Sequence, residues 1–197
     1  MKIQDLPGWC PPAKEEYLTN WVRAHQPKVI VEIGVYGGKS LLPMAVIGQT
    51  YGAKVVGIDP WEVEPCLAGM VESHNKDWWK SHSHLGPVHK ACKDAISTLG
   101  LTNVELWQGT SDQYSRSFQD KEIGLLSVDG NHGPQALVDV MNYFRFVAPG
   151  GLIAMDDTNW VEGGVFHVRH AIEWLTEQGC QKLEVVDECT MLQRPEI

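Results

Sequence analysis

A buried strand that breaks into a glycine turn constrains this chain more than any other feature. Residues 29–33 are apolar except for Glu32, and such a run is typical of a strand covered on both faces of a parallel sheet. The turn that follows reads Gly34-Val35-Tyr36-Gly37-Gly38-Lys39-Ser40, and residues 40–47 are predicted to form a helix near whose start Pro43 is tolerated. Backbone N–H groups and the positive end of a helix dipole then meet at one place. This arrangement favours the polar or anionic part of a nucleotide-like ligand.

A second predicted strand, residues 54–58, ends at Asp59. This acid follows the glycine turn by about 20 residues, the distance at which an acid contacts ribose hydroxyls in βαβ nucleotide-binding folds. The glycine spacing fits neither the dinucleotide pattern G-x-G-x-x-G nor the phosphate-binding pattern G-x-x-x-x-G-K-[ST]. The sequence therefore indicates a nucleoside cofactor of a different kind.

The positions of Glu32, Gly34 and Gly38 resemble the E/D-x-G-x-x-x-G signature of class I S-adenosylmethionine-dependent methyltransferases. The resemblance implies that the backbone of the turn approaches the methionine part of that cofactor. It also implies that Glu32 holds the cofactor's ammonium group and Asp59 its ribose. The implied cofactor site further includes Tyr36, Gly37 and Ser40. The alternative for Glu32 is an acid at the sheet end that pairs with a lysine.

Strands and helices alternate along the rest of the chain. Helices are predicted over residues 13–25, 87–99, 136–147 and 167–178, and strands over residues 104–107, 123–128, 152–155, 183–186 and 190–192. With no internal repeat and no linker, this order predicts a single three-layer α/β domain over residues 1–197, in which residues 1–26 are an N-terminal arm and helix. By the resemblance, the sheet is Rossmann-like and doubly wound, mostly parallel with an antiparallel C-terminal strand.

The loop after the third strand carries Gly109, Thr110 and Ser111. In the methyltransferase superfamily this loop touches the adenine, so either hydroxyl is a candidate hydrogen-bond partner of the base. A Ser-Asp pair is equally typical of a helix N-cap, and the two interpretations stay open.

Composition limits the partners. The formal net charge of −9 and the lack of clustered Lys and Arg disfavour a nucleic acid partner. No apolar run approaches the roughly 18 residues of a membrane-spanning helix, and the N-terminus lacks the apolar region of a signal peptide. The five cysteines are scattered, without C-x-x-C spacing, which suggests reduced thiols. We therefore expect a cytoplasmic protein with a small-molecule partner, and homo-oligomerisation stays open.

Residues 60–86 are the least regular part of the chain, and they combine tryptophans with histidines: Trp61, Trp78, Trp79, His74, His82 and His84, with His89 just beyond. Two closely alternating histidines allow a zinc site, yet no Cys, Asp or Glu partner is fixed by spacing. A mobile lid over the cofactor or substrate is the interpretation we favour, because tryptophan supplies a large contact area at low entropy cost.

Acidic residues also follow the carboxyl ends of later strands, which is where ligands of open α/β sheets bind. Asp129 follows the fourth strand, Asp156 and Asp157 follow the fifth, and these strands are expected to be neighbours. Three converging carboxylates repel one another unless a cation lies between them, and oxygen ligands favour Mg²⁺ over Zn²⁺. The alternative is that one acid caps a helix and another pairs with Arg145 or Arg169.

His132 lies three residues after Asp129 and therefore faces the same opening. An unperturbed histidine, with a pKa near 6.5, can accept a proton from an alcohol at neutral pH. The alternative is a histidine that donates to a backbone carbonyl.

The spacing D-x-x-H followed by D-D resembles the Mg²⁺-dependent sugar O-methyltransferases that tailor macrolide and aminocoumarin antibiotics. Carried over, the resemblance implies Asp129, Asp156 and Asp157 as metal ligands and His132 as the base. Asp129 also belongs to the implied cofactor site. Catechol-type O-methyltransferases are similar but carry D-x-x-K and D-N. This chain lacks the long N-terminal portion by which many sugar methyltransferases bind substrate, so the acceptor is not implied.

The hypothesis is an S-adenosylmethionine-dependent O-methyltransferase that acts on a hydroxyl of a sugar or natural product, with Mg²⁺ or another oxygen-ligated cation. Trp160, three residues after Asp157, and Trp61 are candidate walls for the acceptor. Three alternatives stay open: an NAD-dependent oxidoreductase, a non-catalytic cofactor-binding or scaffold protein, and a metal-independent methyltransferase in which the acids only position the hydroxyl.

Overall fold

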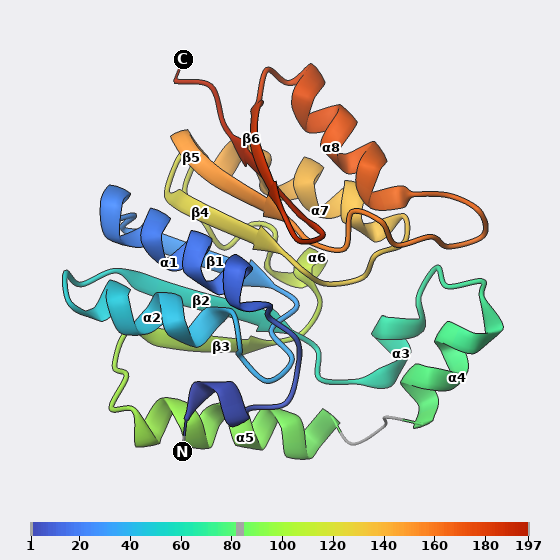
Figure 1. Ribbon diagram of the computed structural model, residues 1–197, viewed down its shortest axis with the longest axis horizontal. Coiled ribbons are helices and arrows are strands. Elements are labelled where there is room, and N and C mark those ends of the chain that lie inside the picture. Colours follow the sequence, from blue (N-terminus) through green and yellow to red (C-terminus); the bar gives the residue numbers. More distant parts are fainter. Residues whose placement is uncertain (1, 82–84, 197) are drawn as a thin grey trace.

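The strand predicted before the glycine turn lies inside a seven-stranded sheet, in a computed structural model that describes residues 2–81 and 85–196 (Figure 1). The strand order is β3-β2-β1-β4-β5-β7-β6. The strands are β1 (Val29–Ile33), β2 (Lys54–Asp59), β3 (Val104–Gln108), β4 (Ile123–Val128), β5 (Val147–Met155), β6 (Gln181–Val186) and β7 (Cys189–Gln193). Strands β1 to β5 pair in parallel, and β7 is antiparallel to both of its neighbours. The predicted mostly parallel sheet with an antiparallel C-terminal strand is confirmed.

The sheet reverses its strand order between β1 and β4, where the chain returns from one edge to continue in the other direction. Ile33 at the end of β1 is in register with Ile58 of β2 and with Val128 of β4. The residues that follow these three positions therefore leave the sheet together. In open α/β sheets this reversal is where ligands bind.

Helices cover both faces of the sheet, as two separate sets of buried side chains show. On one face α1 (Pro12–His25), α2 (Leu41–Gln49) and α5 (Leu85–Thr98) pack on residues such as Ile30 and Val55. On the other face α7 (Gln135–Tyr143) and α8 (His167–Glu177) pack on residues such as Val31 and Ile153. These central strands thus bury both of their faces, which is why their sequences are apolar runs rather than alternations.

The remaining helices of the described part of the fold are η1 (Ile3–Asp5), α3 (Val63–Leu67), α4 (Ser73–Ser81), α6 (Ser111–Tyr114) and η2 (Phe144–Phe146). Of these, α3 and α4 extend beyond the carboxyl ends of the strands, at the right of Figure 1. The predicted irregular region over residues 60–86 is therefore more helical than expected. His82 and His84, the candidate zinc ligands, lie outside the described residues.

Strand β5 begins earlier than its sequence indicates. The sequence predicts this strand over residues 152–155, but β5 already begins at Val147 and includes Pro149, Gly150 and Gly151. The N–H of Gly150 donates to the carbonyl of Arg194, and the N–H of Arg194 donates to the carbonyl of Gly151. These pairings with the chain beyond β7 keep the residues within the strand despite their turn-like composition, although Gly150 has φ +72° and the register with β4 is irregular here. Within residues 2–81 and 85–196, no helix has both the length and the apolar character needed to cross a membrane.

Candidate active site

A cavity of about 890 Å³ opens beyond the carboxyl ends of the strands. The glycine turn, the residues after β2, β3, β4 and β5, helix α4 and the N-terminal arm all contribute to its wall. Most of the predicted site residues line it: Gly34, Tyr36, Gly37, Ser40, Asp59, Gly109, Thr110, Ser111, Asp129, His132, Asp156, Asp157 and Trp160. Glu32, Gly38 and Trp61 are absent from the lining.

The glycine turn brings the ends of β1 and β4 into close contact. Gly34 has φ +86°, and a Cβ atom at this position would lie 2.1 Å from the carbonyl oxygen of Asp129. Only a residue without a side chain fits this conformation and this approach. Gly37 likewise leaves room for the N-terminal arm, because a Cβ atom there would lie 2.1 Å from the carbonyl oxygen of Pro7. The turn is thus shaped both by the sheet and by the arm that covers it.

Asp59 holds the turn in place. One of its oxygens accepts hydrogen bonds from the N–H groups of Val35 and Tyr36, both at 2.9 Å, and the other accepts from the N–H of Trp61 at 2.6 Å. Burial raises the pKa of Asp59, and the three N–H donors partly offset this effect. The acid predicted to bind ribose therefore also fixes the backbone of the predicted methionine site.

Glu32 lies behind the cavity wall. Its side chain is fully buried, and the hydroxyl groups of Ser40 and Ser127 lie close enough to its carboxylate to lower its pKa, although neither carboxylate oxygen meets a donor at ordinary hydrogen-bond geometry among the described residues. Burial raises the pKa of Glu32 to about 7, and the positive charge of Lys14 acts in the opposite direction. The sequence does not predict that Glu32 is enclosed. A single acid in an apolar strand pattern does not show whether its side chain opens into the cavity or is buried behind the cavity wall.

Lys14 of α1 is the residue that sequence analysis missed. Its side chain is only 1% exposed, and its Nζ lies 2.8 Å from Oδ2 of Asp129 and donates a second hydrogen bond to Asp156. Burial alone would lower the pKa of Lys14, but the two carboxylates raise it well above its ordinary value. A signal existed: Lys14 lies at helical spacing from Leu18, Trp21 and Val22, on the buried side of α1.

The two acids respond differently to this shared ammonium group. Burial raises the pKa of Asp129 strongly, with Lys14 opposing and Asp156 reinforcing the effect. Burial acts in the same direction on Asp156 and is the largest single effect, but the charge of Lys14 and the hydrogen bonds with Asp129 and Lys14 together lower the pKa of Asp156 below its ordinary value. The arginines considered from the sequence are elsewhere: Arg145 pairs with Asp120, and Arg169 donates to Thr158 and Asn159.

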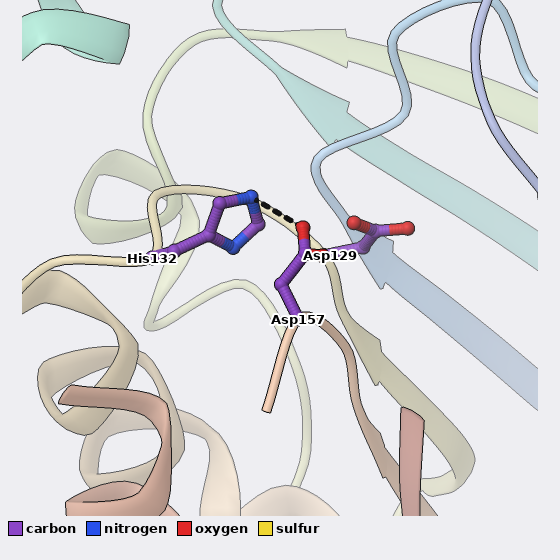
Figure 2. Close-up of side chains that lie close together, drawn as sticks. All are labelled: Asp129, His132 and Asp157. Carbon is purple, nitrogen blue, oxygen red and sulfur yellow. Dashed lines mark ion pairs between the residues drawn. The ribbon is translucent and has the colours of Figure 1, made fainter. Parts of the chain in front are cut away.

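His132 and Asp157 form the second charged pair of the cavity. Nε2 of His132 lies 2.9 Å from Oδ2 of Asp157, and the two side chains point toward each other in Figure 2. One ligand atom from each of Asp129, His132 and Asp157 lies within 4.8 Å of the others. Asp157 has φ +52°, a left-handed conformation that is strained for a residue with a side chain.

The acids are thus arranged differently from the predicted magnesium site. That site requires Asp129, Asp156 and Asp157 around one ion, but Asp156 binds Lys14. The three residues whose ligand atoms lie close enough to hold one metal ion are Asp129, His132 and Asp157. An ammonium group already lies at hydrogen-bond distance from two of the three carboxylates. The residues as placed do not fit an oxygen-only Mg²⁺ site made of three carboxylates.

The loop after β3 makes its hydrogen bonds within the protein. Thr110 is the N-cap residue of α6, and its N–H donates to Oε1 of Gln113 at 2.8 Å. The hydroxyl of Ser111 donates to the buried Asp139 at 2.5 Å. Both residues still line the cavity. The N-cap of α6 is therefore Thr110, one residue before the Ser111-Asp112 pair for which the sequence indicated this role.

The tryptophans divide into two groups. Trp61 is 4% exposed, donates from Nε1 to the carbonyl of Tyr36 and stacks on His89, so it packs beneath the turn rather than facing the cavity. Trp160 lines the cavity with its ring 5.1 Å from that of His132. Trp61 is therefore not in a position to contact an acceptor in the cavity, whereas Trp160 is.

An aromatic cluster made of Trp9, Tyr36, Trp78 and Trp79 covers another side of the cavity. The ring of Trp9 lies 5.4 Å from that of Tyr36 and 5.5 Å from that of Trp78. The N-terminal arm and α4 thus meet over the glycine turn, although they are far apart in sequence.

Glu162, in the loop after β5, ties α4 to the acids. It is buried and accepts hydrogen bonds from the N–H groups of Val71 and Glu72, both at 2.5 Å, and from Nδ2 of Asn75 at 2.9 Å. Nε1 of Trp160 also donates to it. The start of α4 is therefore anchored to the same loop that carries Asp157.

A doubly wound sheet with a glycine turn after its first strand, and acids after β2, β4 and β5, defines the class I methyltransferase fold. The model of the methyltransferase domain family matches residues 31–158. The chain therefore belongs to this family, and the resemblance noted from the sequence is confirmed.

Solved structures show the same fold at low sequence identity. The O-methyltransferase NovP is similar with a TM-score of 0.74 and 15% identity, over 93% of this chain and 80% of that one. TomG from Streptomyces achromogenes, an O-methyltransferase of tomaymycin synthesis solved with S-adenosylmethionine, has a TM-score of 0.67 and 16% identity, over 95% and 81%. The methyltransferase PaMTH1 from Podospora anserina, solved with S-adenosylhomocysteine, has a TM-score of 0.68 and 16% identity, over 94% and 80%. No curated protein matches the chain.

Proposed function

We propose that this chain transfers the methyl group of S-adenosylmethionine to a hydroxyl group of a small molecule. The observation that carries the proposal is the position of the His132–Asp157 pair, which shares one cavity with the glycine turn. Family membership supports methyl transfer, and the structural likeness to TomG and NovP, both described as O-methyltransferases, supports an oxygen acceptor.

The cofactor's methionine part is assigned to the turn formed by Gly34, Tyr36, Gly37 and Ser40, which lines the cavity. Asp59 is assigned to the ribose, and residues 109–111 to the adenine. Glu32 and Gly38 shape the turn from behind and receive no direct contact with the cofactor. When bound, S-adenosylmethionine supplies an electrophilic methyl group on a positively charged sulfur.

His132 is assigned as the general base. If its Nε2–H donates to Asp157, its Nδ1 is the nitrogen that accepts the proton of the acceptor hydroxyl. The Asp157 carboxylate then fixes the ring orientation and stabilises the imidazolium as it forms. The cavity wall, including Trp160, would orient the acceptor hydroxyl, and such positioning would supply much of the acceleration.

Magnesium enters none of these steps. The resemblance implied Mg²⁺ at Asp129, Asp156 and Asp157, but Lys14 binds two of these acids. The metal-independent alternative considered from the sequence, in which the acids position the acceptor hydroxyl, agrees better with this arrangement.

The aromatic cluster is assigned as a lid over the cavity. Trp9 is 64% exposed, and its ring contacts are with Tyr36 of the turn and Trp78 of α4. Closure over a bound cofactor would bury this ring. Tryptophan fluorescence of the wild type should therefore change when S-adenosylmethionine is added, and Trp9→Phe should lose part of that change. An unchanged spectrum in a protein that binds the cofactor contradicts the lid.

The reaction is tested by S-adenosylhomocysteine release with panels of sugar and phenol acceptors, each assayed with the wild type and with His132→Ala. Product formation that His132→Ala lacks supports oxygen methylation with this base. Equal activity of the two proteins contradicts the assigned role of His132.

A further inference from the structure

The side chain of Lys14 reaches the acids of the cavity from the face of the sheet that α1, α2 and α5 cover. Its helix, α1, packs on that face, and the lysine meets the acids that follow β4 and β5 at their carboxyl ends. With 1% of its surface exposed, this ammonium group is sealed from solvent. A lysine is almost never buried this deeply unless it is paired, so its position requires the two carboxylates.

The two carboxylates require the lysine in turn. Asp129 and Asp156 are 18% and 17% exposed, and the described residues place no other ammonium or guanidinium group within ion-pair distance of either. Without Lys14, two partly buried carboxylates would face each other with no opposite charge. Lys14 therefore does for this pair what the sequence analysis expected of a divalent cation.

The same geometry disfavours a second cation. An ion that bridged Asp129 and Asp156 would lie against the fixed positive charge of Lys14, in a partly buried region where such repulsion is only weakly screened. Asp157 has its own partner, because its Oδ2 already lies at hydrogen-bond distance from His132. All three acids of the predicted metal site are thus engaged by side chains of this chain.

We propose that the Lys14 ammonium group is the resident cation of this acid cluster and that it excludes a divalent ion from Asp129 and Asp156. Lys14 is a positioning residue, which holds the acids rather than touching the acceptor. The proposal concerns cation binding alone, so its test does not depend on methyl transfer.

Mn²⁺ is the probe, because its electron paramagnetic resonance signal measures the concentration of the unbound ion. The wild type should leave this signal as it is in buffer. Lys14→Met, which removes the charge but keeps an apolar chain of similar length, should bind Mn²⁺ at least about tenfold more tightly, because a like charge no longer faces the ion. Mn²⁺ should also raise the melting temperature of Lys14→Met and leave that of the wild type unchanged.

Two controls test whether the positive charge must lie at the acids. One keeps the charge there, and the other removes a charge elsewhere in the cavity. Lys14→Arg keeps the positive charge at the acids and should bind Mn²⁺ as weakly as the wild type. Lys39→Met removes a cation that also lines the cavity but donates to the carbonyl of Gly8, away from the acids. It should not gain Mn²⁺ binding.

Lys14→Met leaves two uncompensated acids and can fail to fold. In that case the double variant Lys14→Met/Asp156→Asn is used, which removes one negative charge together with the positive one. This variant should bind Mn²⁺ more tightly than the wild type through Asp129, His132 and Asp157. Tight Mn²⁺ binding by the wild type overturns the proposal. So does a folded variant without Lys14 that binds Mn²⁺ no better than the wild type.

Discussion

The Nε2 atom of His132 lies 2.9 Å from Oδ2 of Asp157, and a backbone with φ +52° holds the aspartate in place. In the proposed mechanism this pair, at the carboxyl ends of β4 and β5, combines a proton acceptor with a carboxylate that stabilises its charged form. Strain at a residue of such a pair is common at functional sites, where the surrounding structure maintains it.

The first prediction concerns this pair. His132→Ala should lower kcat by about 10²–10⁴-fold, the usual contribution of a general base. Asp157→Asn should lower kcat by roughly tenfold or more, because asparagine tolerates the left-handed backbone but cannot stabilise the imidazolium. Steady-state kinetics with any acceptor found in the panel measures both. His170→Ala, on the exposed side of α8, is the control and should match the wild type.

The second prediction compares two glycines with left-handed backbones. Gly34→Ala should lower the free energy of unfolding by on the order of 3 kcal/mol or more, because its Cβ would overlap the carbonyl of Asp129. Gly52 has φ +81°, but a Cβ atom there would have no neighbour within 4 Å, so Gly52→Ala should cost only about 1–2 kcal/mol of backbone strain. Urea unfolding measures the difference. Equal losses would show that the close approach of β1 and β4 is wrong.

The third prediction concerns Asp59. An asparagine keeps one acceptor oxygen but turns an NH₂ group toward backbone N–H donors, so Asp59→Asn should leave at least one of them unpaired. The expected cost is about 1–3 kcal/mol of stability, with weaker cofactor binding because the turn loosens. Urea unfolding and calorimetry measure these two effects. Asp94→Asn, on the exposed surface of α5, should change neither.

The fourth prediction is a pH dependence. Burial raises the pKa of Glu32 from its ordinary 4.5 to about 7, so between these values the folded protein keeps a proton that the unfolded chain releases. The free energy of unfolding should therefore fall as the pH rises through this window. Glu32→Gln removes the effect and should be more stable than the wild type at about pH 8, by on the order of 3 kcal/mol, and nearly equal to it near pH 4.

Urea unfolding of both proteins at several pH values measures this difference. Glu177→Gln, which changes an exposed acid at the end of α8, serves as the control. A difference between Glu32→Gln and the wild type that does not change with pH would contradict the raised pKa.

The sequence predicts the fold well because burial leaves a simple mark on it. Strands β1 and β4 are covered on both faces and are apolar runs, and the glycine turn is needed at the point where β1 meets β4. The start of β5 was missed because its pairing with Arg194 is a long-range contact that overrides the turn preference of Pro149 and Gly150.

Most of the predicted site residues line the cavity, but the sequence did not predict which side chains they contact. The carboxyl ends of neighbouring parallel strands bring Asp129 and Asp157 together, which the order of elements implies. Lys14 comes from a helix whose register on the sheet the sequence does not fix, although its place on the buried stripe of α1 was a usable signal. The direction of Trp61 depends on its φ of +47° and on its hydrogen bond to Asp59, neither of which a composition pattern reveals.

The central claim is that the cavity beside the glycine turn binds S-adenosylmethionine. Calorimetric titration of S-adenosylmethionine, S-adenosylhomocysteine and NAD into the wild type, with and without Mg²⁺, tests it most directly. We predict micromolar, one-to-one binding of the first two, unchanged by Mg²⁺, and no binding of NAD. Binding of NAD in their place, or no binding of either sulfur compound, would contradict the claim.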